Sequence, residues 1–147
     1  MAYQYKFEKI LQLKEREKEM ALESYNESVK KFEEAARHLY SHLKKKEDME
    51  AQQTMKLFAG ISVQEIQHYQ YFIGNFDKVI DHYQKMVVRT RNYMNYFQER
   101  LIEKNIEVKK YEKMKEKDHL HYTENEKWLE AKQMDDISIQ HYMARGN

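Results

Sequence analysis

Hydrophobic residues recur at every seventh position along much of the second half of the chain. The first series holds Ile73, Ile80, Val87, Met94, Leu101 and Val108, and the second, three positions further on, holds Phe76, Tyr83, Phe97 and Tyr111. Thr90 and Lys104 interrupt the second series. Offsets of three and four residues are typical of a coiled-coil seam, whose two positions are named a and d. The pattern therefore predicts a long helix that packs one stripe against a partner helix.

A weaker pattern of the same kind runs through the first half of the chain. Its a positions hold Leu11, Tyr25, Phe32 and Leu39, and its d positions hold Phe7, Ala21, Ala35 and Met49. Lys14, Lys18 and Ser28 interrupt this seam, and we expect them to be solvated exceptions that lower stability but help to fix the register. The first helix alone would be marginal, so it should depend on a partner.

A short motif between the two halves predicts a turn. Gly60 can take the left-handed conformation that ends a helix, and Ser62 with Glu65 forms an S-x-x-E capping box that begins another. Because so short a connection makes neighbouring helices run antiparallel, residue i should lie opposite residue number about 121 minus i. The second helix then extends beyond the end of the first.

The predicted fold class is therefore all-α, with two long helices that form an antiparallel coiled-coil hairpin. We expect helix 1 at about residues 3–58, a turn at about 59–62 and helix 2 at about 62–140, with a flexible C-terminal end. The sequence of 147 residues contains no proline and only three glycines, which favours helices of this length. We expect the whole of 1–147 to form a single domain.

Charge and apolar content exclude several classes of protein. The 26 Lys and Arg residues and the 25 Asp and Glu residues are interspersed, whereas a nucleic-acid binder needs clustered positive charge. The sequence has no apolar run of about 18 residues and no signal-peptide core at its start, so we expect a cytoplasmic protein without direct membrane insertion. The absence of cysteine fits a reducing compartment and excludes thiol chemistry.

Candidate chemistry is sparse. A two-helix hairpin has no interior pocket, and the sequence lacks a glycine-rich phosphate loop and a nucleophile elbow, so we expect neither an enzyme nor a cofactor. His38 and His42 are four residues apart and, with Glu34, could form part of a metal site. Two histidines supply too few ligands, however, and we interpret them as seam-edge and surface residues.

Two segments carry more apolar surface than one partner helix can cover. The first consists of Ile66, Tyr69, Tyr71, Phe72, Ile73 and Phe76, which occupy more than one face of helix 2. It could form a protein-binding surface or pack around the turn. The second segment lies beyond the paired region and contains Trp128, Leu129, Ile137 and Ile139. A partner or self-association could cover it, or this end of the helix could fray.

Three stretches in this order resemble the FliJ family, the soluble coiled-coil component of the bacterial flagellar type III export apparatus. The opening FEKILQLKERE is similar to the start of that family, with Phe7, Ile10, Leu11 and Leu13 before a charged helix. The middle YQYFIGNFDKVI is similar to its Tyr-x-x-Phe-Ile segment, and KQMDDI to its acidic closing motif. The resemblance spans nearly the whole chain.

The resemblance implies a hairpin similar to the coiled-coil stalk of the gamma subunit in rotary ATPases. The end of the hairpin that carries both termini would enter the central hole of the hexameric export ATPase. The residues of the opening and closing motifs implied at that end are Phe7, Ile10, Leu11, Met134, Asp135 and Asp136. Further partners implied are the regulator of this ATPase, the cytoplasmic domain of the large export-gate membrane protein, and the export chaperones that the family escorts for reuse.

The family's contact with the export gate involves the Phe of the Tyr-x-x-Phe-Ile segment and an apolar residue one turn later. These positions correspond to Phe72 and Phe76, with Tyr69 and Ile73 beside them. The second position is more often Leu in the family, which changes the docking shape. Because Phe76 falls at a d position and Phe72 on the flank, we expect Phe72 to be the main exposed anchor.

The leading hypothesis is thus a non-enzymatic adaptor that couples the export ATPase to the gate and serves protein transport, flagellum biogenesis, motility and chemotaxis. It would be a monomeric cytoplasmic protein, peripherally associated with the inner face of the membrane at the flagellar base. A structural spacer or dimerising scaffold is the alternative, and it predicts a homodimer through the imperfect seam of helix 1. A regulatory subunit of a rotary ATPase is a third hypothesis, which would need a membrane-bound proton rotor as partner.

Overall fold

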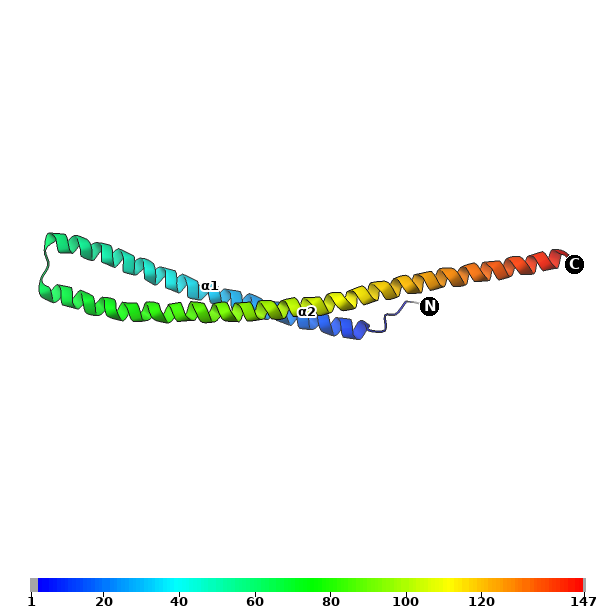
Figure 1. The fold of residues 1–147 in the computed structure, drawn as a ribbon, viewed down its shortest axis with the longest axis horizontal. Coiled ribbons are helices and arrows are strands. Elements are labelled where there is room, and N and C mark those ends of the chain that lie inside the picture. Colours follow the sequence, from blue (N-terminus) through cyan, green and yellow to red (C-terminus); the bar gives the residue numbers. More distant parts are fainter. Residues whose placement is uncertain (1–2, 147) are drawn as a thin grey trace. The chain divides into compact units, whose positions relative to one another are not determined.

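The computed structural model describes residues 3–146 of the chain and, within them, two helices. Helix α1 spans Glu8–Ala59 and helix α2 spans Val63–Gly146 (Figure 1). Helix α1 contains neither glycine nor proline, and Gly74 is the one glycine inside α2 before its last residue, so little interrupts the helical hydrogen bonds. The prediction of an all-α antiparallel hairpin is confirmed.

The ends of both helices differ from the expected ones. Helix α1 begins at Glu8 instead of about residue 3, and residues 3–7 are not helical. Helix α2 continues to Gly146 instead of about residue 140. Its last turns contain no helix-breaking residue before that glycine, so the segment expected to be flexible is helical.

The contacts group the chain into two compact units, which are described separately. Among the described residues, one unit contains residues 3–19 with 103–146, and the other contains Met20–Ile102. In each unit a segment of α1 packs on a segment of α2. The expectation of a single domain stays a prediction.

In the unit of residues 20–102, small side chains of α1 face larger side chains of α2. Ala21 and Ala35 are buried on α1, and Ile80 and Val87 are buried on α2. All four occupy predicted seam positions, with α1 contributing d residues and α2 contributing a residues. Small residues on one side let the two backbones approach while the larger residues fill the space between them.

Two polar seam residues in the same unit are buried. Ser28 is one of the residues expected to be solvated, and this expectation is wrong because its side chain lies inside the seam, as does that of Thr90. The Ser28 hydroxyl donates to the Tyr25 carbonyl oxygen at 2.6 Å, and the Thr90 hydroxyl donates to the Met86 carbonyl oxygen at 2.8 Å. Each hydroxyl is thus satisfied by its own helix, which makes its burial tolerable without solvent.

The turn has the backbone geometry that the sequence suggests. Gly60 has a φ of +90°, and its N–H donates to the Leu57 carbonyl oxygen at 3.3 Å. The Glu65 N–H donates to the Ser62 side-chain oxygen at 3.2 Å, which is the bond expected from an N-cap serine. Gly60 therefore ends α1, and Ser62 caps the start of α2.

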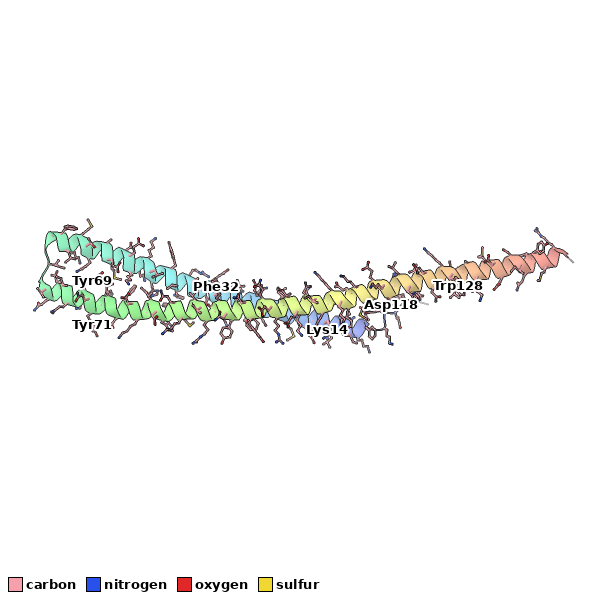
Figure 2. All side chains as sticks on the ribbon, viewed as in Figure 1. Lys14, Phe32, Tyr69, Tyr71, Asp118 and Trp128 are labelled. Atoms are coloured by element: carbon pink, nitrogen blue, oxygen red, sulfur yellow. The ribbon has the colours of Figure 1, made fainter. Side chains whose placement is uncertain are left out.

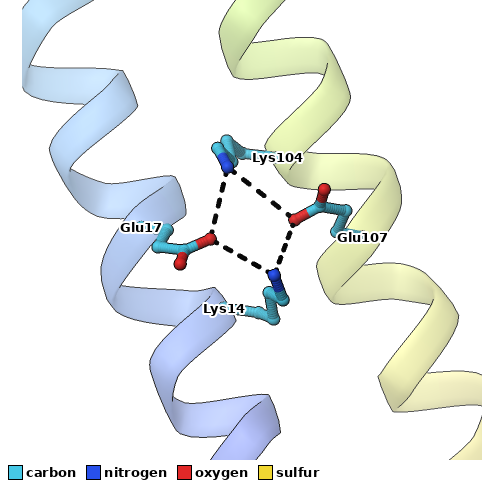
Figure 3. Close-up of polar contacts among 4 residues, drawn as sticks. All are labelled: Lys14, Glu17, Lys104 and Glu107. Carbon is cyan, nitrogen blue, oxygen red and sulfur yellow. Dashed lines mark hydrogen bonds and ion pairs between the residues drawn. The ribbon is translucent and has the colours of Figure 1, made fainter.

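In the unit of residues 3–19 and 103–146, charged residues lie within the seam. Lys14 and Lys104, which interrupt the hydrophobic series, form a closed ring of ion pairs with Glu17 and Glu107 (Figure 3). The Lys14 to Glu107 and Lys104 to Glu17 distances, both 3.3 Å, join the two helices. Opposite charges alternate around the ring, so each lysine side chain contacts both carboxylates.

The non-helical residues before α1 pack on α2 through two tyrosines. Tyr5 is buried, and its hydroxyl donates to the Tyr111 carbonyl oxygen at 3.3 Å. The Tyr3 hydroxyl donates to Asp118 Oδ2 at 2.9 Å, and its ring lies edge-on to that of His119. Desolvation and the hydrogen bond to Asp118 raise the pKa of Tyr3 to about 12. These contacts replace the helical turn that the sequence pattern predicts here.

Candidate partner-binding surface

The aromatic segment at the start of α2 divides into an exposed part and a covered part. Phe72 is 49% exposed, whereas Phe76 and Ile73 are half-buried. The rings of Phe72 and Phe76 are nearly parallel at 20°, with their centroids 6.3 Å apart. Phe72 is thus the more accessible of the two phenylalanines, and Phe76 supports it from the seam side.

Phe76 contacts the ring of His42 on α1, and His42 in turn contacts Tyr83. The ring of His42 is 5.5 Å from that of Phe76 and 4.9 Å from that of Tyr83, and His38 stacks on Tyr83 at 5.1 Å and 13°. His42 Nδ1 is 2.7 Å from the His38 carbonyl oxygen, which holds the imidazole against the helix. The two histidines therefore serve as packing partners. Within residues 3–146, no group of His, Cys, Asp and Glu residues could hold a metal ion.

An ion pair joins α1 to α2 beside this segment. Lys46 Nζ lies 2.7 Å from Asp77 Oδ1, one residue after Phe76. The hydrogen bond to Asp77 raises the pKa of Lys46, and partial burial raises the pKa of Tyr69, with the nearby Glu50 carboxylate adding to the effect. Lys46 therefore stays charged and Tyr69 stays neutral well above neutral pH.

A shallow groove of about 670 Å³ lies beside the turn. Tyr69 and Phe72 line it from α2, and Gln53 and Lys56 line it from α1. Figure 2 places Tyr69 on the side of α2 that faces α1 and Tyr71 on the opposite side, where Tyr71 is 73% exposed. An apolar ring at the edge of a groove with a polar rim is typical of a protein-binding anchor.

The pattern of the sequence identified the aromatic residues of this surface but missed their support from α1. His42 occupies a seam position, and the predicted register places it close to Phe76, which is the signal that could have found the contact. The predicted register also places Lys46 within two residues of Asp77, but the charge pattern did not single out this pair. Their pairing depends on the side-chain conformation of a long lysine, and many other opposite charges lie at similar spacing along both helices.

The residues expected at the ATPase-ring end do not come together. Leu11 is only 3% exposed because α2 covers it, while Phe7 is half-buried and Ile10 is exposed. Met134, Asp135 and Asp136 are all exposed, farther along α2. In the register of the seam, Phe7 lies opposite a part of α2 that is about 20 residues, or ~30 Å, from Met134.

The last turns of α2 carry the second apolar segment. Every residue from 124 to 146 is exposed, including Trp128, Leu129, Ile137 and Ile139. Trp128 lies on this part of α2 (Figure 2). Lys132 Nζ is 5.3 Å from the centre of the Trp128 ring, a cation–π contact. None of the described helices is long and apolar enough to span a membrane.

Comparison with known proteins places the chain in one family. The family model described as flagellar FliJ protein matches residues 3–147. The flagellar FliJ protein of Bacillus subtilis (strain 168) is 51% identical over 147 residues, covering 100% of both chains. No solved structure matches the chain. A match over nearly the full length, together with a relative of this identity, shows that the chain belongs to the flagellar FliJ protein family.

Proposed function

We propose that this protein is a non-enzymatic adaptor of flagellar protein export that couples the export ATPase to the export gate. Its membership of the FliJ family supports an export-associated flagellar protein. The adaptor would bind the hexameric ATPase and its regulator at one end, contact the cytoplasmic domain of the gate, and escort export chaperones. Such contacts would place it peripherally at the inner face of the membrane.

The observation that carries the gate contact is the exposure of Phe72 beside the groove at the turn. Phe72 and Tyr69 line this groove, and Phe76 supports the Phe72 ring from below. The Lys46–Asp77 pair and the His42 ring hold this part of α2 on α1, so the anchor is positioned before a partner arrives. A preorganised aromatic anchor loses little conformational entropy on binding.

The covered seam of α1 argues against the alternative of a dimerising scaffold. A homodimer through helix 1 would need the stripe that contains Ala21 and Ala35, but these residues are buried against α2 of the same chain. The scaffold would therefore have to break the hairpin before it could dimerise through that stripe.

Replacing Phe72 by alanine tests the proposed gate contact. Binding to the purified cytoplasmic domain of the gate, measured by titration calorimetry, should weaken about tenfold or more, because truncation of a central aromatic anchor removes a hot spot. Tyr71→Ala is the matched control, since Tyr71 is the neighbouring exposed aromatic residue on another face. Circular dichroism should be the same for both variants. Unchanged affinity of Phe72→Ala, or an equal loss with Tyr71→Ala, would contradict the proposal.

A further inference from the structure

A second groove, of about 810 Å³, lies on α2 away from the turn. Its eight lining residues form two neighbouring rows with a spacing of four residues. One row is Gln84, Val88, Asn92 and Tyr96, and the other is Lys85, Arg89, Tyr93 and Phe97. The groove spans nearly four helical turns, or about 20 Å. None of the residues proposed for the gate contact or for the ATPase end lines it.

Three of the four apolar residues of this groove are exposed, and only the seam residue Phe97 is half-buried. Val88, Tyr93 and Tyr96 are between 54% and 56% exposed, whereas the neighbouring seam residue Val87 is 8% exposed. Positions Val88 and Tyr96 fall outside the a and d series, so α1 cannot reach them. Three half-exposed apolar side chains in adjoining turns form a surface that favours a partner.

The charge of the groove has one sign. No Asp or Glu occurs between Asp81 and Glu99, which is the longest stretch of the sequence without an acidic residue. Lys85 and Arg89 are the charged residues that line the groove. Lys85 pairs with Asp81 at 3.0 Å, and Arg89 has no ion-pair partner within residues 3–146. An occupant with negative charge would therefore pair with Arg89 without displacing another carboxylate.

The form of the groove, which lies on a single helix, is compatible with a helical occupant. Side chains four residues apart form ridges on a helix, and the groove between two such ridges accepts a ridge of a second helix. Tyr93 and Tyr96 offer wide, rigid contact surfaces in this groove, and tyrosine is common in protein interfaces for that reason. A flat lipid surface would not fit between the two rows of side chains. A nucleic acid would require more positive charge in the groove than Lys85 and Arg89 supply.

We propose that this groove binds an amphipathic helix of a partner protein, with an apolar stripe that packs on Val88 and Tyr96 and acidic residues that face Lys85 and Arg89. The contact is small, so the complex should be weak and should dissociate readily. Because the ionic part is exposed to solvent, binding should weaken as the salt concentration rises.

The test uses the full-length chain and two synthetic helical peptides of about 18 residues that share one leucine stripe. One peptide carries glutamates beside the stripe and the other carries lysines. In fluorescence anisotropy, the acidic peptide should bind at least tenfold more tightly. Arg89→Glu should weaken its binding tenfold or more, and Val88→Ser should also weaken it. Lys78→Glu, an equal charge change at an exposed position outside the groove, should change the affinity less than twofold.

Other occupants give different results, and each of these would overturn the proposal. Equal binding of both peptides, or an equal effect of Lys78→Glu and Arg89→Glu, would leave only nonspecific adhesion. Tighter binding to phosphatidylglycerol vesicles or to single-stranded RNA than to the acidic peptide would assign the surface to those ligands. A dimer in sedimentation velocity that Arg89→Glu dissociates would make a second copy of the chain the occupant. No binding of either peptide would also refute it.

Discussion

Gly60 and Gly74, with only 13 residues between them in the sequence, have different backbone conformations. Gly60 has a φ of +90°, a conformation that residues with a side chain rarely adopt. Gly74 lies inside α2, and a methyl group added there would meet no atom within 4 Å. The first glycine is therefore required by the turn, and the second only adds flexibility to the helix.

Alanine substitutions at the two glycines should change stability in opposite directions. Gly60→Ala should lower the free energy of unfolding by about 1–2 kcal/mol, because alanine is strained at positive φ. Gly74→Ala should raise it by up to about 1 kcal/mol, because alanine favours the helix and has room for its methyl group. Urea unfolding followed by circular dichroism measures both effects. A destabilised Gly74→Ala variant would mean that this glycine has a role beyond the helix.

Glu17 is the carboxylate of the ion-pair ring whose titration is most informative. The hydrogen bond from Lys104 lowers its pKa below the usual 4.5, in spite of the opposing effect of desolvation. The unfolded chain therefore binds the proton more readily than the folded chain does. The resulting stabilisation is present above pH 4.5 and is lost as the pH falls through the lower pKa of the folded state.

Glu17→Gln should make thermal stability less dependent on pH in acid. The wild-type melting temperature should fall between about pH 5 and pH 2 by more than that of the variant, since the variant has no carboxylate to protonate at this position. Glu19→Gln is the matched control, because Glu19 is exposed and belongs to the same segment of α1. Parallel pH profiles for the wild type and Glu17→Gln would refute this role of the ring.

At the scale of the helices, the seven-residue pattern was sufficient to predict the pairing. It placed residue i near 121 minus i, and the contacts between Lys14 and Glu107 and between Lys46 and Asp77 follow that register within two residues. The pattern succeeds because each seam residue must be covered by the opposite helix, so a shift would expose the whole stripe. The same pattern identified the aromatic segment, because its apolar residues occupy more of the helix surface than one seam stripe can bury.

The details that the sequence did not predict depend on individual side chains. Tyr3 and Tyr5 replace a helical turn by packing on α2, and periodicity gives no sign of this because tyrosine is compatible with a helix. Ser28 was expected in solvent, but its hydroxyl can bond to its own helix, which lets a small side chain enter the seam. The second groove was missed because all of its lining residues except Phe97 lie outside the a and d positions on which the pattern depends.

At the scale of the molecule, the proposed adaptor uses separate parts of the chain for its two main partners. The gate surface belongs to the unit of residues 20–102, whereas Met134, Asp135 and Asp136 belong to the other unit. Because the two sets of residues belong to different units, we expect their effects to be independent.

Substitutions at the two sites should therefore affect different functions. The triple variant Met134→Ser, Asp135→Asn and Asp136→Asn should reduce stimulation of export-ATPase hexamer formation several-fold and leave gate binding unchanged. Phe72→Ala should have the reverse effect. Light scattering of the ATPase measures hexamer formation, and calorimetry measures gate binding. Loss of both functions in either variant would argue against separate sites, and an unchanged ATPase response to the triple variant would exclude these three residues as contacts.

The small seam residues of α1 also bear on how the protein is made. Ala21, Ser28 and Ala35 follow one another at seven-residue intervals, so two copies of α1 paired in register would place these small side chains opposite each other and bury less apolar area there than α1 buries against α2. During synthesis α1 leaves the ribosome before α2 exists, and neighbouring nascent chains on one messenger RNA present identical copies of it. The shape of the seam thus discourages pairing between these nascent chains and reserves α1 for the α2 of its own polypeptide.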